Sequence, residues 1–357
     1  MYRHMACFGI VALAVLVLWA LMAPPASALT NDGATLDIGS GESLTLDGIH
    51  EYTSSISIHD GGVLYVGASR TLTLRAPSIT ISGEGCINGA GGASAAGGAT
   101  VVLDCTTLAI NGPGGITARG RDGFYAGSPV TVDGGAGGSI EIRAATRATL
   151  SGGFLNAAGG NGYGDASRSG AGGNGGTVIV RSAVLDRADA AGTAIDVSGG
   201  DAADTTFETG ADGGDGGSVT MSFADYDAGA AVNASGGDGA NAHEAGGDGG
   251  NGGAITAHWC LKTGTENVNV DAGWGGTGDF SNGANGTTGT TSSQLTMDAQ
   301  YEPAPVVVNG SIDPGEYAQS WQWVFDGYKK VFIAQDGEAF YVAVQISSVG
   351  YGWVYDL

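Results

Sequence analysis

Short runs of alternating apolar and polar residues dominate the chain from residue 34 to about residue 82. Runs such as Thr35–Ile38, Ser43–Leu46 and Ser55–Ile58 follow one another, with Gly, Asp and Ser between them. Period-two alternation with regular turn signals is typical of β-strands that bury one face. No segment after residue 28 shows the apolar stripe of an amphipathic helix. The pattern therefore predicts an all-β fold.

A longer period is superimposed on this alternation. Diglycine pairs recur, and each leads directly into a short apolar strand; the pairs end at Gly98, Gly138, Gly176, Gly217 and Gly253, so that successive pairs lie 40, 38, 41 and 36 residues apart. A period of about 20 to 50 residues indicates stacked structural units rather than a closed globule. The sequence therefore predicts a repeat protein.

A second landmark of each repeat is an Asn or Asp that directly follows an apolar residue. In parallel strands, equivalent residues stack about 4.8 Å apart. Asn side chains there can hydrogen-bond along the stack while they cap a turn. The predicted column contains Asn88, Asn111, Asn156, Asp196, Asn233 and Asp271.

Glycine-rich excursions separate the strand-forming stretches. Residues 201–217 and 238–253 hold hardly an apolar side chain. Such a composition fits disorder as well as stacked loops. We favour ordered stacking, because the repeat boundaries are so evenly kept.

The two ends of the chain differ from the repeats. Residues 1–28 carry Arg3 and His4 before an apolar run and end in Pro24–Ala28, which is typical of a signal peptide; an uncleaved anchor is the alternative. Residues 277–304 read as a Gly/Thr/Ser-rich linker. Residues 305–357 hold aromatic, hairpin-spaced strands and predict a second, sandwich-like β unit. We expect the protein to be exported, to the cell surface or beyond, with no membrane insertion after cleavage.

The negative net charge of the chain limits the kinds of partner that we expect it to bind. The formal net charge is −23, with only 13 Lys and Arg against 36 Asp and Glu. Anionic nucleic acid and anionic lipid repel such a chain, so both are excluded as expected partners. Extracellular polysaccharide or other surface proteins remain as the expected partners.

Two family resemblances follow from these motifs. The strand, I-N/D-x-x-G-G, glycine-rich loop and G-G-[ST]-I/V-x-I/V pattern resembles right-handed parallel β-helix proteins of prokaryotic surfaces, over about residues 34–300. This implies an all-β solenoid with N-terminal turns at 29–96, glycine-rich repeats at 97–276 and glycine-rich loop insertions. The same helix serves adhesins, surface layers and polysaccharide lyases, so the resemblance implies architecture rather than activity.

The C-terminal segment resembles the opening of DOMON-like and family 9 carbohydrate-binding modules. The matching stretches are residues 308–317 (VNGSIDPGEY) and 336–344 (DGEAFYVAV). Only part of such a module is present. We therefore expect this segment either to continue in a longer chain or to pack on the end of the repeat stack.

Candidate chemistry is sparse. The outward strand positions hold no pair of acids suited to hydrolysis, so no catalytic residue is assigned and an enzyme is not expected. Aromatic faces stack on sugars, and the candidates for carbohydrate binding are Trp321, Trp323, Tyr328, Tyr341 and Trp353; core packing is the alternative for them. Carboxylates in glycine-rich loops suit calcium, a cofactor that could be bound by Asp212, Asp215, Asp238 and Asp248, although solubility alone also explains them.

Cysteine spacing leaves one further question open. Cys86 and Cys105 are 19 residues apart, close to one solenoid turn, so in an exported protein they could form a disulfide or stay free. Taken together, the sequence predicts a non-catalytic structural or adhesive surface protein. The alternatives are a carbohydrate-binding protein and a lyase-like β-helix.

Overall fold

The computed structural model describes most of the chain after residue 30. The described residues are 31–92, 97–124, 133–165, 168–186, 193–206, 209–227, 231–259, 261–263, 267–295, 300–301, 321–325, 329–335, 340–346 and 351–356. They contain strands and loops and no helix, so the all-β prediction is confirmed for them. No helix in this part of the chain is long and apolar enough to cross a membrane. The predicted signal peptide lies outside the described residues.

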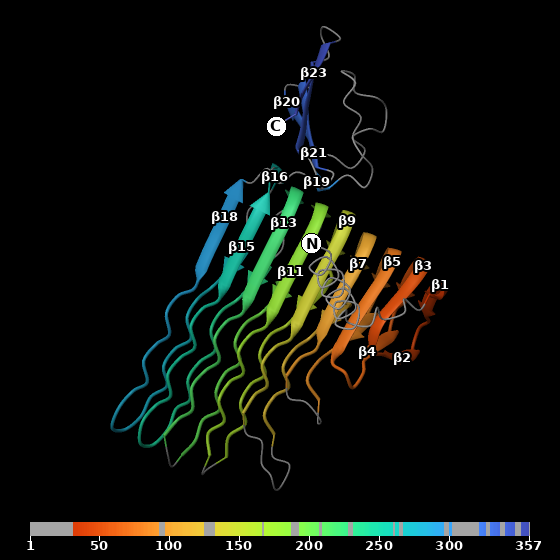
Figure 1. The fold of residues 1–357 in the computed structure, drawn as a ribbon. Helices are drawn as coiled ribbons and strands as arrows, with labels where there is room; N and C mark the ends of the chain where they lie inside the picture. Colours follow the sequence, from red (N-terminus) through yellow and green to blue (C-terminus); the bar gives the residue numbers. More distant parts are fainter. Residues whose placement is uncertain are drawn as a thin grey trace, which may run out of the picture.

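The first long sheet, sheet A, is built from strands that pair only in parallel (Figure 1). Its order along the sheet is β1 (Asn31–Ile38), β3 (Gly48–Ile58), β5 (Thr71–Ser82), β7 (Thr100–Asn111), β9 (Ser139–Ser151), β11 (Thr177–Asp186), β13 (Ser218–Asp227), β15 (Ala254–Trp259) and β18 (Thr290–Leu295), and β16 (Leu261–Thr263) also pairs with β13.

The second long sheet, sheet B, is also entirely parallel and consists of shorter strands. It contains β2 (Ser43–Leu46), β4 (Val63–Val66), β6 (Cys86–Asn88), β8 (Gly115–Thr117), β10 (Phe154–Asn156), β12 (Thr193–Asp196), β14 (Ala231–Asn233) and β17 (Asn267–Asn269). Strands of the two sheets alternate along the sequence. Each pass of the chain, called a repeat below, therefore adds one strand to each sheet.

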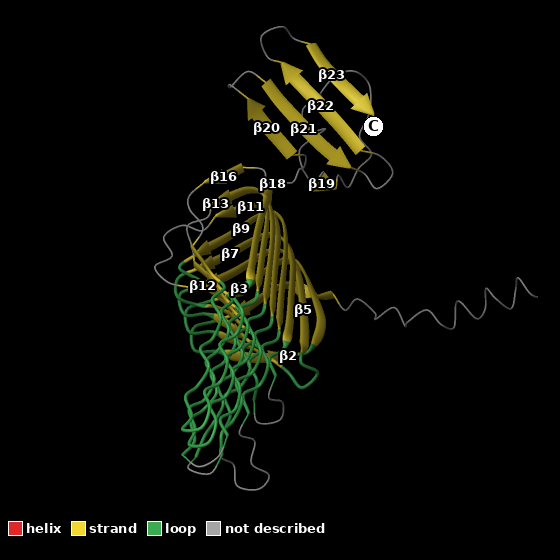
Figure 2. Cartoon of the chain, turned by 90° about the vertical axis from the view of Figure 1, so that its left-hand side faces the viewer, coloured by secondary structure: helices red, strands yellow, loops and turns green. Residues whose placement is uncertain are grey.

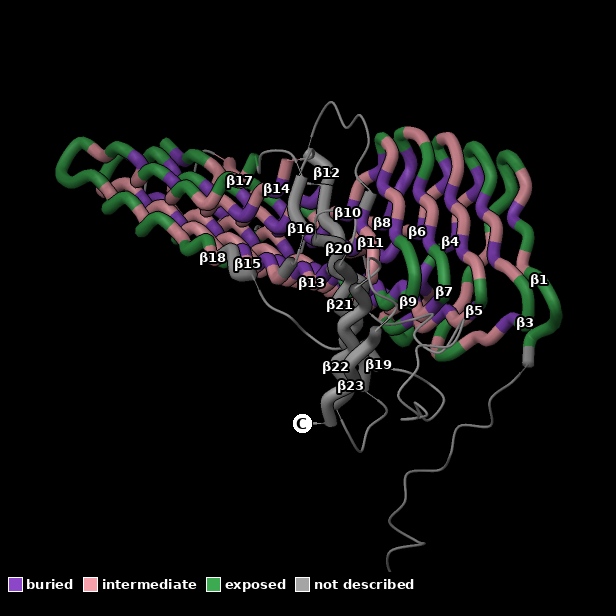
Figure 3. The backbone as a smooth tube through the Cα atoms, turned by 90° about the horizontal axis from the view of Figure 1, so that it is seen from above, coloured by how far each residue is buried: buried purple, intermediate pink, exposed green. Residues whose placement is uncertain are grey.

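The core lies between the two sheets and follows from the alternation. Along sheet A, register aligns the fully or almost fully buried Val101, Ile140, Val178, Val219 and Ile255. Sheet B aligns the equally buried Ile87, Ile116, Leu155, Ile195 and Val232. Each such side chain contributes about 1.5–3 kcal/mol when it leaves water, so every repeat stabilises the next. Figure 3 shows these buried positions alternating with more exposed ones.

Between each sheet-B strand and the next sheet-A strand, the later repeats make a long glycine-rich excursion. These excursions stack side by side (Figure 2). Each has an outgoing leg and a return leg, and hydrogen bonds join legs within and between repeats. Gly214 N–H donates to Gly200 O at 2.9 Å, and Gly200 N–H donates to Gly173 O at 2.8 Å. The excursions thus form one hydrogen-bonded layer, called the glycine array below, as expected for ordered stacking.

Close approach of backbones, not left-handed backbone conformation, requires glycine in this array. Positive φ occurs at glycines near the strand turns, such as Gly61 and Gly152, and not at glycines in the described parts of the stacked legs. A Cβ at Gly176 would lie 1.9 Å from Gly138 O, and one at Gly217 would lie 2.0 Å from Gly176 O. No side chain fits there, so the legs can pack this closely only as glycine.

The predicted linker at 277–304 is wrong over much of its length. Residues 270–289 make the last excursion, and β18 (Thr290–Leu295) pairs in parallel with β15. The Gly/Thr/Ser-rich composition suggested a linker, but Gly283, Gly286 and Gly289 donate backbone hydrogen bonds to Gly276, Gly273 and Val270 as the legs of the array do. The stack therefore includes one more repeat than expected.

The C-terminal strands form a separate sheet. It contains β19 (Gln300–Tyr301), β20 (Trp321–Phe325), β21 (Lys329–Gln335), β22 (Phe340–Ile346) and β23 (Tyr351–Asp356). β20 to β23 pair antiparallel, with β21 between β20 and β22, and β19 pairs with β21 in parallel. The antiparallel pairing of β20 to β23 distinguishes this sheet from sheets A and B, and the second, sandwich-like unit stays a prediction.

Candidate functional site

The glycine array carries a regular arrangement of polar side chains that recurs from repeat to repeat. At Asn161, the side-chain Oδ1 accepts the N–H of Asp201 in the next repeat at 3.0 Å. The N–H of the following residue, Gly162, donates to the carbonyl of the same Asp201 at 2.8 Å. One Asn or Asp thus holds one residue of the next repeat at two points. We call this arrangement an Asx clamp.

Asx clamps recur in four rows across the array. The first row runs Asp122, Asn161, Asp201, Asp238 and Trp274; the second runs Asp133, Ala171, then Asp212, Asp248 and Ala284; the third runs Asn174, Asp215, Asn251 and Thr287; and the fourth runs Asp204, Asn241 and Thr277. Ala171 interrupts the second row, because alanine offers no acceptor. Every row ends in the last repeat at a residue that is neither Asp nor Asn.

The aspartates proposed for calcium lie within these rows. Asp212 and Asp248 are neighbours in the second row, while Asp215 and Asp238 lie in the third and first rows. Each uses Oδ1 to accept a backbone N–H of the next repeat. Among the described residues, no three His, Cys, Asp or Glu side chains converge as a metal site would require. Calcium binding stays a prediction, and the rows give these carboxylates a structural role that the sequence analysis missed.

The predicted Asn/Asp column exists, with two different members. Register aligns Asn88, Thr117, Asn156, Asp196, Asn233 and Asn269 at the ends of the sheet-B strands. Asn111 and Asp271 are therefore wrong: Asn111 ends β7 in sheet A, opposite Ser82, and Asp271 lies two residues beyond the column. The I-N-G motif at Asn111 marks a different turn, in which Gly112 has φ of 102°.

The column members cap turns, as expected. Oδ1 of Asn156 accepts the N–H of Ala158 at 3.0 Å, and Asn233 does the same for Ser235 at 3.2 Å. One bond along the column connects Asn233 Nδ2 to Asp196 Oδ1 at 3.2 Å. These side chains start each excursion in the same direction.

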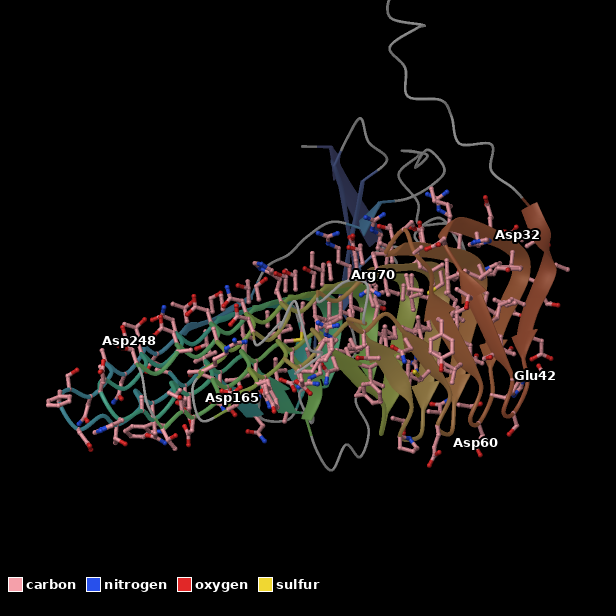
Figure 4. All side chains as sticks on the ribbon, turned by 90° about the horizontal axis from the view of Figure 1, so that it is seen from below. Asp32, Glu42, Asp60, Arg70, Asp165 and Asp248 are labelled. Carbon is pink, nitrogen blue, oxygen red and sulfur yellow. The ribbon has the colours of Figure 1, made fainter. Side chains whose placement is uncertain are left out.

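Arg70 closes the other end of the array. It follows β4 in a repeat that has no glycine excursion, and its φ of 60° is unusual for a residue other than glycine. Its guanidinium donates to Gly97 O at 2.7 Å, to Gly89 O at 3.0 Å and to Ala90 O at 3.1 Å. The guanidinium thus occupies carbonyls that a preceding excursion would have bonded. In Figure 4 Arg70 lies near the sheets, whereas Asp248 lies far out on the array.

The outward face of sheet A carries a small ionic network. Glu141 Oε1 accepts Arg143 Nε at 2.9 Å and a terminal nitrogen of Arg181 at 2.9 Å. Bonding to Glu141 raises the pKa of Arg143 against the opposing effect of burial, with Asp104 adding to the rise. About half of each arginine side chain remains exposed. This face therefore holds two carboxylates, Glu141 and Asp104, and each is paired with arginine: Glu141 with Arg143 and Arg181, and Asp104 with Arg75 at 3.8 Å.

The two cysteines do not form the disulfide that the spacing suggested. Cys86 lies in β6 of sheet B and Cys105 in β7 of sheet A, and both are free thiols. Strand register explains this: Cys86 in β6 pairs with Val63 in β4 of the preceding repeat, 23 residues earlier. Because one repeat is longer than 19 residues here, Cys105 lies not above Cys86 but in the other sheet. Burial, together with Asp104, raises the pKa of the Cys105 thiol to about 12, and burial raises the pKa of Cys86 as well.

The C-terminal sheet brings three of the proposed sugar-binding aromatics into neighbouring register positions. Trp323 is aligned through Val331 and Val344 with Trp353. Trp321 starts the adjacent row through Ile333 and Val342. Tyr341 pairs with Ala334 and is one position out of step with these rows, and Tyr328 lies outside the described residues.

A shallow groove crosses four repeats where the array meets sheet A. Its volume is about 560 Å³, and backbone glycine and hydroxyl side chains line it, among them Gly176, Thr177, Gly217, Ser218 and Thr290. Thr177, Ser218, Ala254 and Thr290 are in register along it. The groove is therefore uncharged and periodic, with hydroxyl groups and glycine backbone repeated along it.

Comparisons with known proteins identify no relative of this chain: no family model, no curated protein and no solved structure matches it.

Proposed function

We propose that this protein is an exported, non-catalytic structural protein whose glycine array forms a stiff contact surface at the cell exterior. The observation that carries the proposal is the repetition of the Asx clamps, which places equivalent side chains on successive repeats. Such a surface offers the same weak contact many times. Linked contacts of this kind can bind far more tightly than any single contact.

We further propose that sheets A and B wind as a right-handed parallel β-helix. The strands alternate between two parallel sheets, and connections between parallel strands of one sheet are almost always right-handed. In this arrangement each repeat contacts chiefly its neighbours. The protein would then be an extended support from which the array projects.

Polysaccharide and other surface proteins are the partners we propose. The groove supports a neutral, hydroxyl-rich polymer, because it is lined by hydroxyls and glycine backbone and runs across repeats. The ionic network on sheet A supports a non-catalytic role, since Glu141 is already held by Arg143 and Arg181.

The test combines location and binding. Impermeant labelling of intact cells should modify the protein, and insoluble cell-wall polysaccharide should retain the purified chain. Thr177→Val with Ser218→Val should weaken retention if the groove makes the contact, while Thr149→Val, on β9 away from the groove, serves as the matched control. Protein found only inside cells, or no retention by any surface polymer or surface protein, would overturn the proposal.

Carbohydrate binding by the C-terminal sheet is the second candidate. The alignment of Trp323 with Trp353, beside the Trp321 row, favours it. Glycan-array binding should then disappear in Trp321→Ala with Trp323→Ala, while Tyr341→Ala should retain it. Release of reducing sugar from polysaccharide by the intact chain would instead support the lyase-like alternative.

A further inference from the structure

Asn-Gly sequences are especially prone to spontaneous deamidation, and several of them lie in the glycine array. The backbone nitrogen of the glycine can attack the Asn side-chain Cγ. A C–N bond forms, the C–NH₂ bond breaks and ammonia leaves. Water then opens the resulting succinimide to Asp or to isoaspartate. The attack needs a free glycine N–H and a side chain that can turn toward it.

The Asx clamp blocks both requirements at the interior sites. At Asn161, Asn174 and Asn251, Oδ1 accepts an N–H of the next repeat at 2.9–3.0 Å. The following glycine N–H donates to the carbonyl of the same partner residue at 2.8 Å in each case. The side chain and the attacking nitrogen are thus both held by one residue, and both bonds must break before the ring can close.

The last repeat contains two Asn-Gly sequences without this clamp. Asn282 Oδ1 accepts the N–H of Gly278 at 3.2 Å, while Gly283 N–H donates to Gly276 O at 2.9 Å. Asn285 Oδ1 accepts the N–H of Gly275 at 2.8 Å, while Gly286 N–H donates to Gly273 O at 3.1 Å. These groups are therefore bonded too, but only to residues of the same, last repeat. A local opening of that one repeat releases both groups, whereas an interior clamp opens only when two repeats separate. Both asparagines are exposed.

We propose that, of the five Asn-Gly sequences at Asn161, Asn174, Asn251, Asn282 and Asn285, those at Asn282 and Asn285 are the sites of spontaneous deamidation in the folded protein, and that the Asx clamps protect the other three. Isoaspartate inserts a methylene into the backbone, which would break the spacing of the array at an interior site. In the last repeat the same change disturbs one outer layer.

Deamidation would disturb the array most at Asn251. Its Nδ2 donates to Asp215 Oδ1 at 3.0 Å, and its Oδ1 accepts both the N–H and the hydroxyl of Thr287. Deamidation would replace the amide donor by a carboxylate facing Asp215. Protection of this residue thus keeps the third row of clamps intact.

The experiment follows deamidation by peptide mapping with mass spectrometry. The full chain is incubated at mildly alkaline pH, folded or in denaturant. We expect Asn282 and Asn285 to deamidate at least ten-fold faster than the three interior sites in the folded chain, and all five sites to react at similar rates in denaturant. Equal rates at interior and last-repeat sites in the folded chain would overturn the proposal.

A variant pair tests the clamp itself. Thr287→Pro removes the N–H that holds Asn251 Oδ1, and Asn251 should then deamidate in the folded chain. Thr287→Ala removes the hydroxyl and keeps that N–H, so Asn251 should stay protected. Circular dichroism verifies that both variants fold. A Thr287→Pro protein that folds and still protects Asn251 as the parent does would contradict the role of the clamp.

Discussion

At the scale of single residues, the side chain of Arg70 caps the first layer of the glycine array. A charged hydrogen-bond donor to a carbonyl contributes about 1.5–3 kcal/mol, and the Arg70 guanidinium reaches three carbonyls. We expect Arg70→Ala to lower the free energy of unfolding by about 2 kcal/mol or more, as measured by urea denaturation. Arg70→Lys keeps the charge but loses the planar fork, and should recover only part of the loss. A fully stable Arg70→Ala protein would show that the cap is dispensable.

Glycine at Gly176 is required by space alone. Its missing Cβ would meet Gly138 O at 1.9 Å, whereas a Cβ at Gly92 would meet nothing within 4 Å. Overpacking costs about 1–3 kcal/mol where neighbours can shift, and the neighbour here is backbone. Gly176→Ala should therefore lower the melting temperature by several degrees or prevent folding, while Gly92→Ala should leave it almost unchanged. Similar effects of the two substitutions would argue against close packing of the legs.

At the scale of the element, the Asx clamp is the unit that joins one excursion to the next. Asp201 Oδ1 accepts the N–H of Asp238 at 2.9 Å. Asp201→Ala should remove this acceptor and cost about 1 kcal/mol. Hydrogen exchange at the Asp238 amide should then become faster by about five-fold, since 1.4 kcal/mol corresponds to a factor of about ten.

Asp201→Asn is the matched control for that substitution. It retains Oδ1 and should leave the exchange rate of the Asp238 amide nearly as in the parent. Other rows alternate Asp with Asn in the same way, for example Asp215 with Asn251. If Asp201→Asn accelerated exchange as much as Asp201→Ala, the negative charge and not the acceptor would be the cause.

At the scale of the whole molecule, the ends of the rows define where stacking stops. Trp274, Thr277, Ala284 and Thr287 receive clamps from the preceding repeat and carry no Asx side chain to hold a further one. Trp274 is also 70 % exposed. The sequence of the last repeat therefore terminates the array.

Substitutions that add side-chain hydrogen-bond acceptors to the last repeat should allow the array to associate with a second copy of the chain. In Trp274→Asn with Ala284→Asp, two rows would present Oδ1 groups on the outer layer, where an unpaired edge favours pairing with another chain. We expect concentration-dependent dimers in sedimentation velocity that are absent for Trp274→Ala. A double variant that stays monomeric at the same concentrations would show that other features of the last repeat block association.

The alternation of residues such as Ile140 and Ile142 with Glu141 and Arg143 was enough to predict strands and the buried face. This is because strand periodicity is local and burial follows from it. The diglycine period likewise predicted repeats. The predicted column was wrong at Asn111 and Asp271, since an apolar residue followed by Asn or Asp occurs at more than one place in the repeat, and only strand register separates these places.

What the sequence by itself determined is therefore the all-β class, the repeat and the polar character of the excursions, all of which depend on local pattern. The tertiary structure decided which residues meet: the free cysteines on opposite sheets, the guanidinium of Arg70 on three carbonyls and the pairing of each Asx with the next repeat. The Arg70 and Asx contacts join residues between 19 and 41 positions apart, at separations that vary from repeat to repeat. Because the lengths of the excursions and turns set those separations, only the folded stack specifies them.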